Sequence, residues 1–405
     1  MKVNVSSKHL ISKLSTFFGV EFGLLLGFLL MRMVVDTVAR MFYPFLTPIA
    51  SGLGLTVTAM GLVISFRSWV GLIEPLVGIA ADRFGKKKLM TACLIIQAIG
   101  LIGIPFTSGW WAIAPISLIG IGMSPFVSLG QAYISDQVPY ANRGRSLAFV
   151  NMSFAISGIF ILPVIGWLIN QNGSNGWRIP FIILGGFCLL AAGYTIWFLE
   201  ESPHQHSTPK AANIFKEFQQ LIRDPAVVTV ISLGFLLFYT FIVFSVVWAI
   251  WLQDKFNLDP SDIGKIARMI GYAELTAVVL SIFIIDWIGK KLNLQISFFL
   301  IILLCLTWIF FPHTLYTATL NMIVLGGVFE YSILAFFPLI SDQLPNARAS
   351  LFTLTGFGIS IGFALGPIIS LYLWELAGIQ SVLSMLISSI VLAALLVAAR
   401  LKAVH

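Results

Sequence analysis

Long apolar runs alternate with short polar segments along the whole chain. Each run has about 20 residues, the length that an α-helix needs to cross the hydrocarbon core of a bilayer. The shorter apolar–polar alternation typical of membrane β-strands does not fit runs of this length. The pattern predicts twelve transmembrane helices, at residues 22–48, 57–81, 89–106, 111–135, 146–170, 178–199, 226–252, 262–285, 293–311, 315–340, 349–374 and 378–399.

Composition identifies lipid as the solvent of this chain. Apolar residues make up 58% and charged residues only 10% of the 405 residues, and the mean hydropathy is +0.96. A soluble domain carries about 25% charged residues, so this chain must expose apolar side chains to lipid. Backbone polar groups in lipid need internal partners. We therefore expect an all-α membrane protein.

One polar stretch divides the twelve runs into two sets of six. It extends from Glu200 to Pro225 and contains Pro203, two histidines and charges of both signs. We expect an N-terminal six-helix bundle at residues 1–199, a cytoplasmic linker at 200–225 and a C-terminal six-helix bundle at 226–405.

The distribution of basic residues predicts the orientation. With the N-terminus in the cytoplasm, Arg178, Lys255 and Lys265 are the only Lys or Arg residues that fall in outer segments, whereas the inner segments hold many. Cytoplasmic loops are the ones enriched in Lys and Arg. We expect a multi-pass protein of the cytoplasmic (inner) membrane, a monomer with both termini inside. The net charge of +7 then reflects this bias and attraction to anionic lipid, not a nucleic-acid partner.

Three short motifs occur twice, about half the chain apart. Residues 134–139 (ISDQVP) recur at 340–345 (ISDQLP), and residues 82–87 (DRFGKK) recur at 286–291 (DWIGKK). A third pair, LPVIG and GPIIS, begins at Leu162 and Gly366. Such repetition predicts two similar halves, and transporters built in this way bind their substrate at the interface between the halves.

The segment at residues 78–88, GIAADRFGKKK, lies between the second and third runs. It resembles the signature loop of the major facilitator superfamily, and the second copy resembles it less, with Trp287 in place of the Arg and Ile282 in place of the leading Gly. The resemblance covers nearly the whole chain. It implies two pseudo-symmetric six-helix bundles that rock about a central site.

The signature loop and two helix breakers supply candidate gating residues. A glycine at 85 permits a tight turn, and the negative charge of Asp82 can lie near a helix N-terminus, which the resemblance places at the start of span 11. Pro163 and Pro367 resemble the Gly-Pro bend of drug–proton antiporters, although small residues at this spacing equally mark simple helix packing. The gating candidates are Gly78, Asp82, Arg83, Gly85, Lys86, Asp286, Gly289, Pro163 and Pro367.

Ionisable residues within the spans supply candidate binding residues. Arg32, Asp36 and Arg40 are spaced i, i+4, i+8 and share one helix face. Asp36 cannot neutralise both arginines, so one guanidinium could bind an anionic or polar ligand. Equally, the three could form a closed structural network. The substrate-binding candidates are Arg32, Asp36, Arg40, Arg268, Tyr239, Trp248 and Tyr331.

Glu330, in the tenth run, is the first candidate for proton coupling, with Asp36 and Glu274 in reserve. A carboxyl group in a low-dielectric setting holds a proton more readily than in water. The position that corresponds to Glu330 in the first half is a serine, Ser124, and a charge that breaks the repeat is a better candidate for ion chemistry than a shared one. The alternative is a carboxylate kept ionised by Arg32 or Arg268.

These observations favour a secondary transporter over an enzyme. The sequence holds no metal-ligand cluster, nucleotide-binding loop or nucleophile–base pair, and we expect no cofactor. The first function that we consider is proton-coupled efflux of a small organic solute by alternating access. The second is uptake or exchange of an organic anion held by the arginines of the first span. The third is a sensor or assembly factor that uses this scaffold without transporting.

Overall fold

A computed structural model describes residues 5–71, 77, 80–81, 84–139, 142–201, 224–311, 313–343 and 348–401. Every element in this part of the chain is helical, which confirms the all-α membrane fold. The elements are α1 (Val5–Phe18), α2 (Phe22–Met41), α3 (Leu46–Leu53), α4 (Val57–Gly71), α6 (Lys86–Gly103), η1 (Ile104–Phe106), η2 (Gly109–Ala112), α7 (Ile113–Gln137), α8 (Arg143–Asn151), α9 (Ser153–Ile156), η4 (Ser157–Ile161), α10 (Leu162–Gln171), η5 (Gly173–Asn175), α11 (Arg178–Phe198), α13 (Pro225–Phe256), α14 (Pro260–Ile288), α15 (Lys290–Phe310), α16 (Leu315–Gln343) and α17 (Arg348–Arg400).

The number of spans depends on how two bends are counted. Ten helical segments of the described chain are long and apolar enough to cross a membrane, or eleven if the bent pair α3 and α4 forms one span. The helix α17 has 53 residues, about twice the length that a bilayer requires. Its backbone is not helical at Ala377 and Gly378, so it contains two spans in sequence. The predicted twelve are reached only when α17 is divided there.

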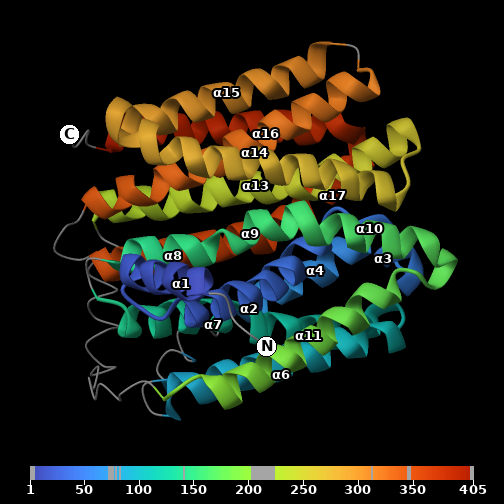
Figure 1. The fold of residues 1–405 in the computed structure, drawn as a ribbon. Helices are drawn as coiled ribbons and strands as arrows, with labels where there is room; N and C mark the ends of the chain where they lie inside the picture. The colour runs from blue at the N-terminus through green and yellow to red at the C-terminus, as the bar shows by residue number, and fades with distance from the viewer. Residues whose placement is uncertain are drawn as a thin grey trace.

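The helices lie side by side, with their axes roughly along one direction (Figure 1). We call α1 to α11 the N-terminal half and α13 to α17 the C-terminal half. The two halves pack together where α17 meets α4 and where α14 meets α10, η4 and α9. The end at which α6, α8, α15 and α17 begin is called the basic end, because Lys86, Arg143, Lys290 and Arg348 start these helices. The other end is called the far end.

Matching glycine turns at the basic end support the internal repeat. Gly85 precedes α6 with φ 93° and ψ 140°, and Gly289 precedes α15 with φ 94° and ψ 139°. A side chain at either position would strain this left-handed backbone. The two copies of the loop motif therefore share one backbone turn, even though their flanking side chains differ.

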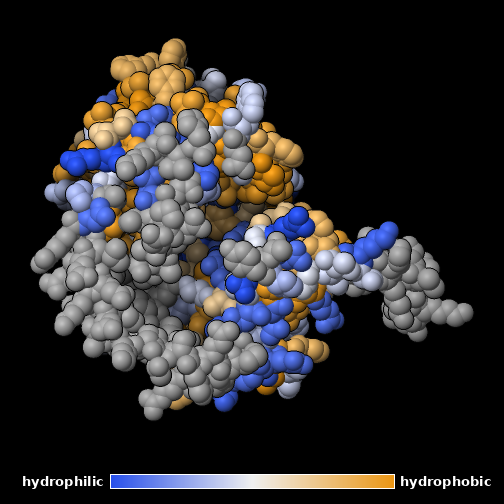
Figure 2. Space-filling model, turned by 90° about the vertical axis from the view of Figure 1, so that its left-hand side faces the viewer, coloured by the Kyte–Doolittle hydropathy of each residue, from blue (hydrophilic) through white to orange (hydrophobic). Residues whose placement is uncertain are grey.

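The far end is closed by close backbone contacts between the halves. A Cβ added to Gly166 would meet the carbonyl oxygen of Pro260, and one added to Gly264 would lie 3.0 Å from Cα of Pro163. Asn170 Nδ2 also donates to Asp259 Oδ2 at 3.1 Å. Viewed from the basic end, in contrast, the surface is hollowed between the upper, mostly hydrophobic part and the lower part (Figure 2).

The predicted division into two bundles and a linker stays a prediction. In Figure 1 the helices before and after the polar stretch gather in different parts of the molecule. Residues 202–223, most of the predicted linker, lie outside the described residues. So do Gly78, Asp82 and Arg83 of the signature loop, and the side chain of Asp286.

Candidate functional site

A bidentate ion pair joins the two halves within the membrane. Arg40, one residue before the end of α2, donates from Nη1 to Glu274 Oε2 at 2.7 Å and from Nη2 to Oε1 at 2.9 Å. Glu274 lies in the middle of α14, 234 positions further along the chain. The Glu274 side chain is only 4% exposed. Two parallel charge-assisted hydrogen bonds fix the relative orientation of the two groups as well as their distance.

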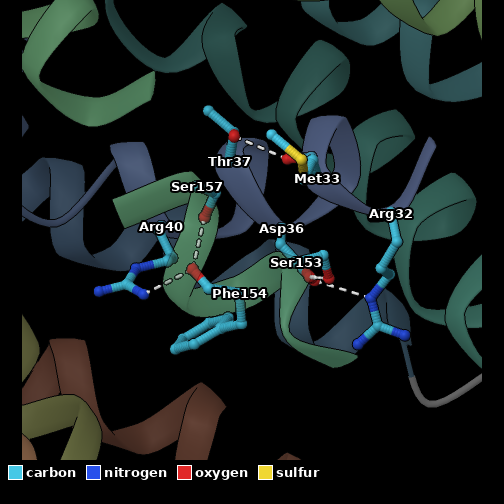
Figure 3. Close-up of polar contacts among 8 residues, drawn as sticks. All are labelled: Arg32, Met33, Asp36, Thr37, Arg40, Ser153, Phe154 and Ser157. Atoms are coloured by element: carbon cyan, nitrogen blue, oxygen red, sulfur yellow. Dashed lines mark hydrogen bonds and ion pairs between the residues drawn. The ribbon is translucent and has the colours of Figure 1, made fainter. Parts of the chain in front are cut away.

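The fifth span holds Arg40 in place from the other side. Arg40 Nη1 also donates to the carbonyl oxygen of Phe154 at 3.0 Å, and its guanidinium lies 4.1 Å from the centre of the Phe154 ring. Figure 3 shows Phe154 beside the guanidinium, with Ser157 donating to the same carbonyl. Hydrogen bonding and cation–π attraction together orient the guanidinium.

The π-helical turn η4 follows directly after α9, which contains Phe154, and leads into α10, whose second residue is Pro163. Proline has no N–H, so the carbonyl of Ile159, four residues earlier, loses its usual helical donor. Arg268 of α14 supplies the missing hydrogen bond from Nε at 3.1 Å. The fifth span therefore offers two backbone carbonyls, one to an arginine from each half.

Gly271 lies between the two polar contacts of α14. A Cβ at this position would lie 3.0 Å from the backbone nitrogen of Ile159 and 3.2 Å from the carbonyl carbon of Gly158. The helices α14 and η4 therefore cross at backbone contact distance, which small residues allow in membranes. Arg268 and Glu274 flank this crossing and fix its register.

The other charges of the first span form a separate group. Arg32 Nε donates to Asp36 Oδ1 at 2.8 Å, and the hydroxyl of Ser153 donates to Asp36 Oδ2 at 2.5 Å (Figure 3). Asp36 is 4% exposed. Of the two arginines that the spacing allowed as partners, Asp36 therefore pairs with Arg32, whereas Arg40 bonds across the interface.

Glu330, on α16, interacts electrostatically with the Arg40–Glu274 ion pair. It is half-buried, and its carboxylate interacts electrostatically with both Glu274 and Arg40. The carboxylate forms no hydrogen bond with the described residues. Two carboxyl groups therefore compete for one guanidinium at this point.

Arg67 of α4 is a buried cation that sequence reasoning left unassigned. It is 3% exposed. Its guanidinium donates to the carbonyls of Val38 and Ala39 at 3.3–3.4 Å and to the hydroxyl of Tyr43 at 3.0 Å. These carbonyls end α2 where the first span breaks, and a positive charge is favourable at a helix C-terminus. Arg67 therefore caps the C-terminal end of α2 at the break between α2 and α3.

The aromatic candidates lie mainly in the packing of the C-terminal half. Tyr239 and Trp248 of α13 are each 5% exposed and belong to its hydrophobic core, and the Tyr239 hydroxyl donates to the sulfur of Met385 at 2.8 Å. Tyr331 of α16 donates to Asn293 Oδ1 at 2.5 Å, and Asn293 in turn donates to the Gly289 carbonyl at 2.9 Å. Roles for these three in substrate binding stay predictions.

The described gating candidates lie in two places. Lys86 forms an ion pair with Asp136, so the loop motif and the ISDQ motif of the first half are partners. Pro163 and Pro367 lie in the contacts between halves, since a Cβ at Gly61 would lie 3.1 Å from the Pro367 carbonyl oxygen. Their part in gating stays a prediction.

The model of the Major Facilitator Superfamily matches residues 28–350. The chain belongs to this superfamily. The superfamily expected from the loop at residues 78–88 is thereby confirmed, and so is the multi-pass membrane protein that the apolar runs predicted. The match agrees with the prediction of a transporter rather than an enzyme.

Solved transporters share the fold. The nucleoside transporter NupG superimposes with a TM-score of 0.76 at 18% identity, covering 94% of this chain and 100% of the other. The D-xylose-proton symporter superimposes with a TM-score of 0.73, also at 18% identity, covering 94% and 98%. Identities this low inform on the fold alone.

Relatives by sequence match over shorter stretches. Multidrug resistance protein 2 of Bacillus subtilis is 25% identical over 59% of this chain and 60% of its own length. The multi-drug resistance efflux pump PmrA of Streptococcus pneumoniae is 28% identical over 37% of this chain and 35% of its own. An uncharacterized transporter of Buchnera aphidicola is 28% identical over 52% and 51%. The chain thus spans from about a third to three fifths of the length of these relatives.

Proposed function

We propose that this protein is a proton-coupled secondary transporter that exports a small organic solute across the cytoplasmic membrane by alternating access. Membership of the superfamily supports solute transport. The names of two relatives, which are multidrug resistance proteins, support efflux. We place the basic end, at which α6, α8, α15 and α17 begin, on the cytoplasmic side, because cytoplasmic segments are enriched in Lys and Arg.

The observation that carries the coupling proposal is the group Arg40, Glu274 and Glu330. A charge inside a membrane protein is costly unless it is paired. One guanidinium pairs fully with one carboxylate, and Glu274 already occupies both of its terminal nitrogens. A second ionised carboxylate nearby would be repelled by the first. Glu330 therefore carries a proton for part of the cycle.

Alternating access then moves the proton. Glu330 takes up a proton while the site faces outward and releases it when the site faces the cytoplasm. The closed far end and the hollowed basic end are what an inward-facing state requires. Solute leaves the cell as the proton enters, so the proton gradient drives export.

A second candidate, transport of an organic anion, rests on Arg32. Only its Nε bonds to Asp36, and Figure 3 shows the two terminal nitrogens turned away from that bond. Arg32 also lines a cavity of about 10 Å³ together with Gln131 and Phe126, which is room for about one water molecule. A fork of two N–H donors suits a carboxylate or phosphate.

Purified protein in proteoliposomes tests the first proposal. The probe is ethidium, a fluorescent lipophilic cation, and an imposed pH gradient is the only driving force. We expect gradient-dependent accumulation by the natural protein and none by Glu330→Gln, whose exchange of labelled ethidium survives. Glu375→Gln, an exposed site on α17, is the matched control and should behave as the natural protein. If the Glu330→Gln variant still accumulated ethidium, Glu330 would not be the coupling residue.

A further inference from the structure

The Arg40–Glu274 pair lies between the hollow and the closed end. Arg40 is the last but one residue of α2, at the break of the first span. Beyond it, toward the far end, lie the contacts of Gly166 with Pro260 and of Asn170 with Asp259. On the other side the surface opens at the basic end (Figure 2). Opening the far end therefore has to separate α14 from α2 and α9 at this pair.

We propose that Arg40 and Glu274 form a proton-released latch that holds the far end closed. This inference rests on the proposed proton coupling, and it assigns to Glu274 a task different from that of Glu330. The latch is closed when both groups are ionised, because an ion pair needs two charges. It opens when Glu274 accepts a proton.

The charged groups around Glu274 make the pair sensitive to protons. Arg40 faces it from α2 and Glu330 from α16. Helices α9, η4 and α10 contain no charged residue in their sequences, and on α14 itself Arg268 bonds to the Ile159 carbonyl. Separating the halves with Glu274 ionised would leave two unpaired charges, which is strongly unfavourable away from water. With a proton on Glu274, only the guanidinium loses its partner.

Arg268 forms the second polar contact across the same crossing, and its chemistry is different. Its acceptor is a backbone carbonyl, which does not titrate. Both contacts hold α14 against the N-terminal half, and only one of them responds to pH. The Arg268 contact therefore serves as the control for the pH response of the Arg40–Glu274 contact.

Spin-label distances measure the latch directly. Nitroxides at Gln171→Cys on α10 and Ser261→Cys on α14 report the separation of the halves at the far end by double electron–electron resonance. Cys93, Cys188 and Cys305, all buried, are replaced by alanine in this background. We expect the ratio of open to closed distances to rise as the pH falls. In Glu274→Gln the ratio should be raised about tenfold or more and no longer depend on pH.

Two further variants make the result decisive. The double variant Arg40→Gln/Glu274→Gln leaves no unpaired charge and should also be insensitive to pH, which covers the case that Glu274→Gln folds poorly. Arg268→Gln should raise the open fraction but keep the pH response. A Glu274→Gln or double variant that stays closed, with the pH response of the natural protein, overturns the latch.

Glu330→Gln separates the latch from the coupling proposal. It should keep a pH-dependent distance distribution while it loses proton-driven accumulation of ethidium. If Glu330→Gln accumulates ethidium normally and Glu274→Gln abolishes the pH response, the latch stands and the coupling role of Glu330 falls. If Glu330→Gln alone abolishes the pH response, Glu330 is the sensor and the latch assignment falls.

Discussion

Pro163 and Arg268 come from opposite halves and act on the same carbonyl group. Pro163 removes the helical donor of the Ile159 carbonyl, and Arg268 Nε replaces it at 3.1 Å. A helix breaker in one half thereby creates the acceptor for a cation of the other. The proline of the fifth span and the contact between the halves therefore depend on the same carbonyl group.

Replacing Pro163 by alanine should weaken the hydrogen bond between Arg268 and the Ile159 carbonyl. The alanine N–H would compete with Arg268 for the Ile159 carbonyl, because it restores the intrahelical hydrogen bond. We expect Arg268→Gln to cost less thermal stability in the Pro163→Ala background than in the natural protein, by about 0.5–1.5 kcal/mol, the net contribution of one hydrogen bond. A double-mutant cycle of thermal denaturation in detergent measures this difference. Strictly additive effects would show that the two residues act independently.

Arg67 should be required for stability. Arg67→Ala removes hydrogen bonds to the Val38 and Ala39 carbonyls and to Tyr43, and it leaves the end of α2 uncapped. Hydrogen bonds to a charged group contribute about 1.5–3 kcal/mol each, so we expect a clear fall in the midpoint of thermal denaturation. Lys265→Ala, an exposed cation on α14, is the control and should have little effect. An equal fall in both variants would contradict the capping role.

The crossing of α14 and η4 should not tolerate a side chain at Gly271. Gly271→Ala places a methyl group 3.0 Å from the Ile159 backbone nitrogen, so the helices must separate. We expect lower transport and a lower denaturation midpoint. Gly356→Ala on α17 is the matched control, because a Cβ there has open space. That variant should be neutral or more stable by about 0.4–1 kcal/mol.

Arg32 should discriminate between the two candidate substrates. A thermal-shift screen with benzoate, inorganic phosphate and ethidium measures binding, because a ligand stabilises the protein that binds it. If an organic anion is the substrate, Arg32→Lys should weaken binding of benzoate or phosphate about tenfold and leave ethidium binding unchanged, since an ammonium cannot reproduce the planar fork. An unchanged affinity for every ligand would make the Arg32–Asp36 pair structural.

Helix positions and local pairs could be predicted from the sequence, because they depend on short-range periodicity. The i, i+4 spacing allowed Asp36 to pair with either Arg32 or Arg40, and the glycines of the repeated loops predicted their turns. The partner of Arg40 could not be predicted. Glu274 lies 234 positions away, and nothing in the spacing of either residue states which helices cross. Only the geometry of the crossing selects Glu274 over Asp36.

The carbonyl contacts of the fifth span were missed for a different reason. Every residue has a backbone carbonyl, so the identity of Phe154 or Ile159 does not indicate that its carbonyl accepts a hydrogen bond from an arginine. Pro163 did give a partial signal, because a proline within a helix frees the carbonyl four residues earlier. The π-helical turn η4 gave none, since its sequence SGIFI resembles that of any buried helix.

The matched turns at Gly85 and Gly289 show what divergence between the two repeats has left untouched. Asp-Arg-Phe before one glycine and Asp-Trp-Ile before the other differ in charge and size, yet the φ and ψ angles agree within one degree. A turn of this shape tolerates different side chains before the glycine, because its path depends on the positive φ that glycine adopts without strain. Replacement of either glycine would therefore disturb the start of the following helix more than any exchange among the three residues before it.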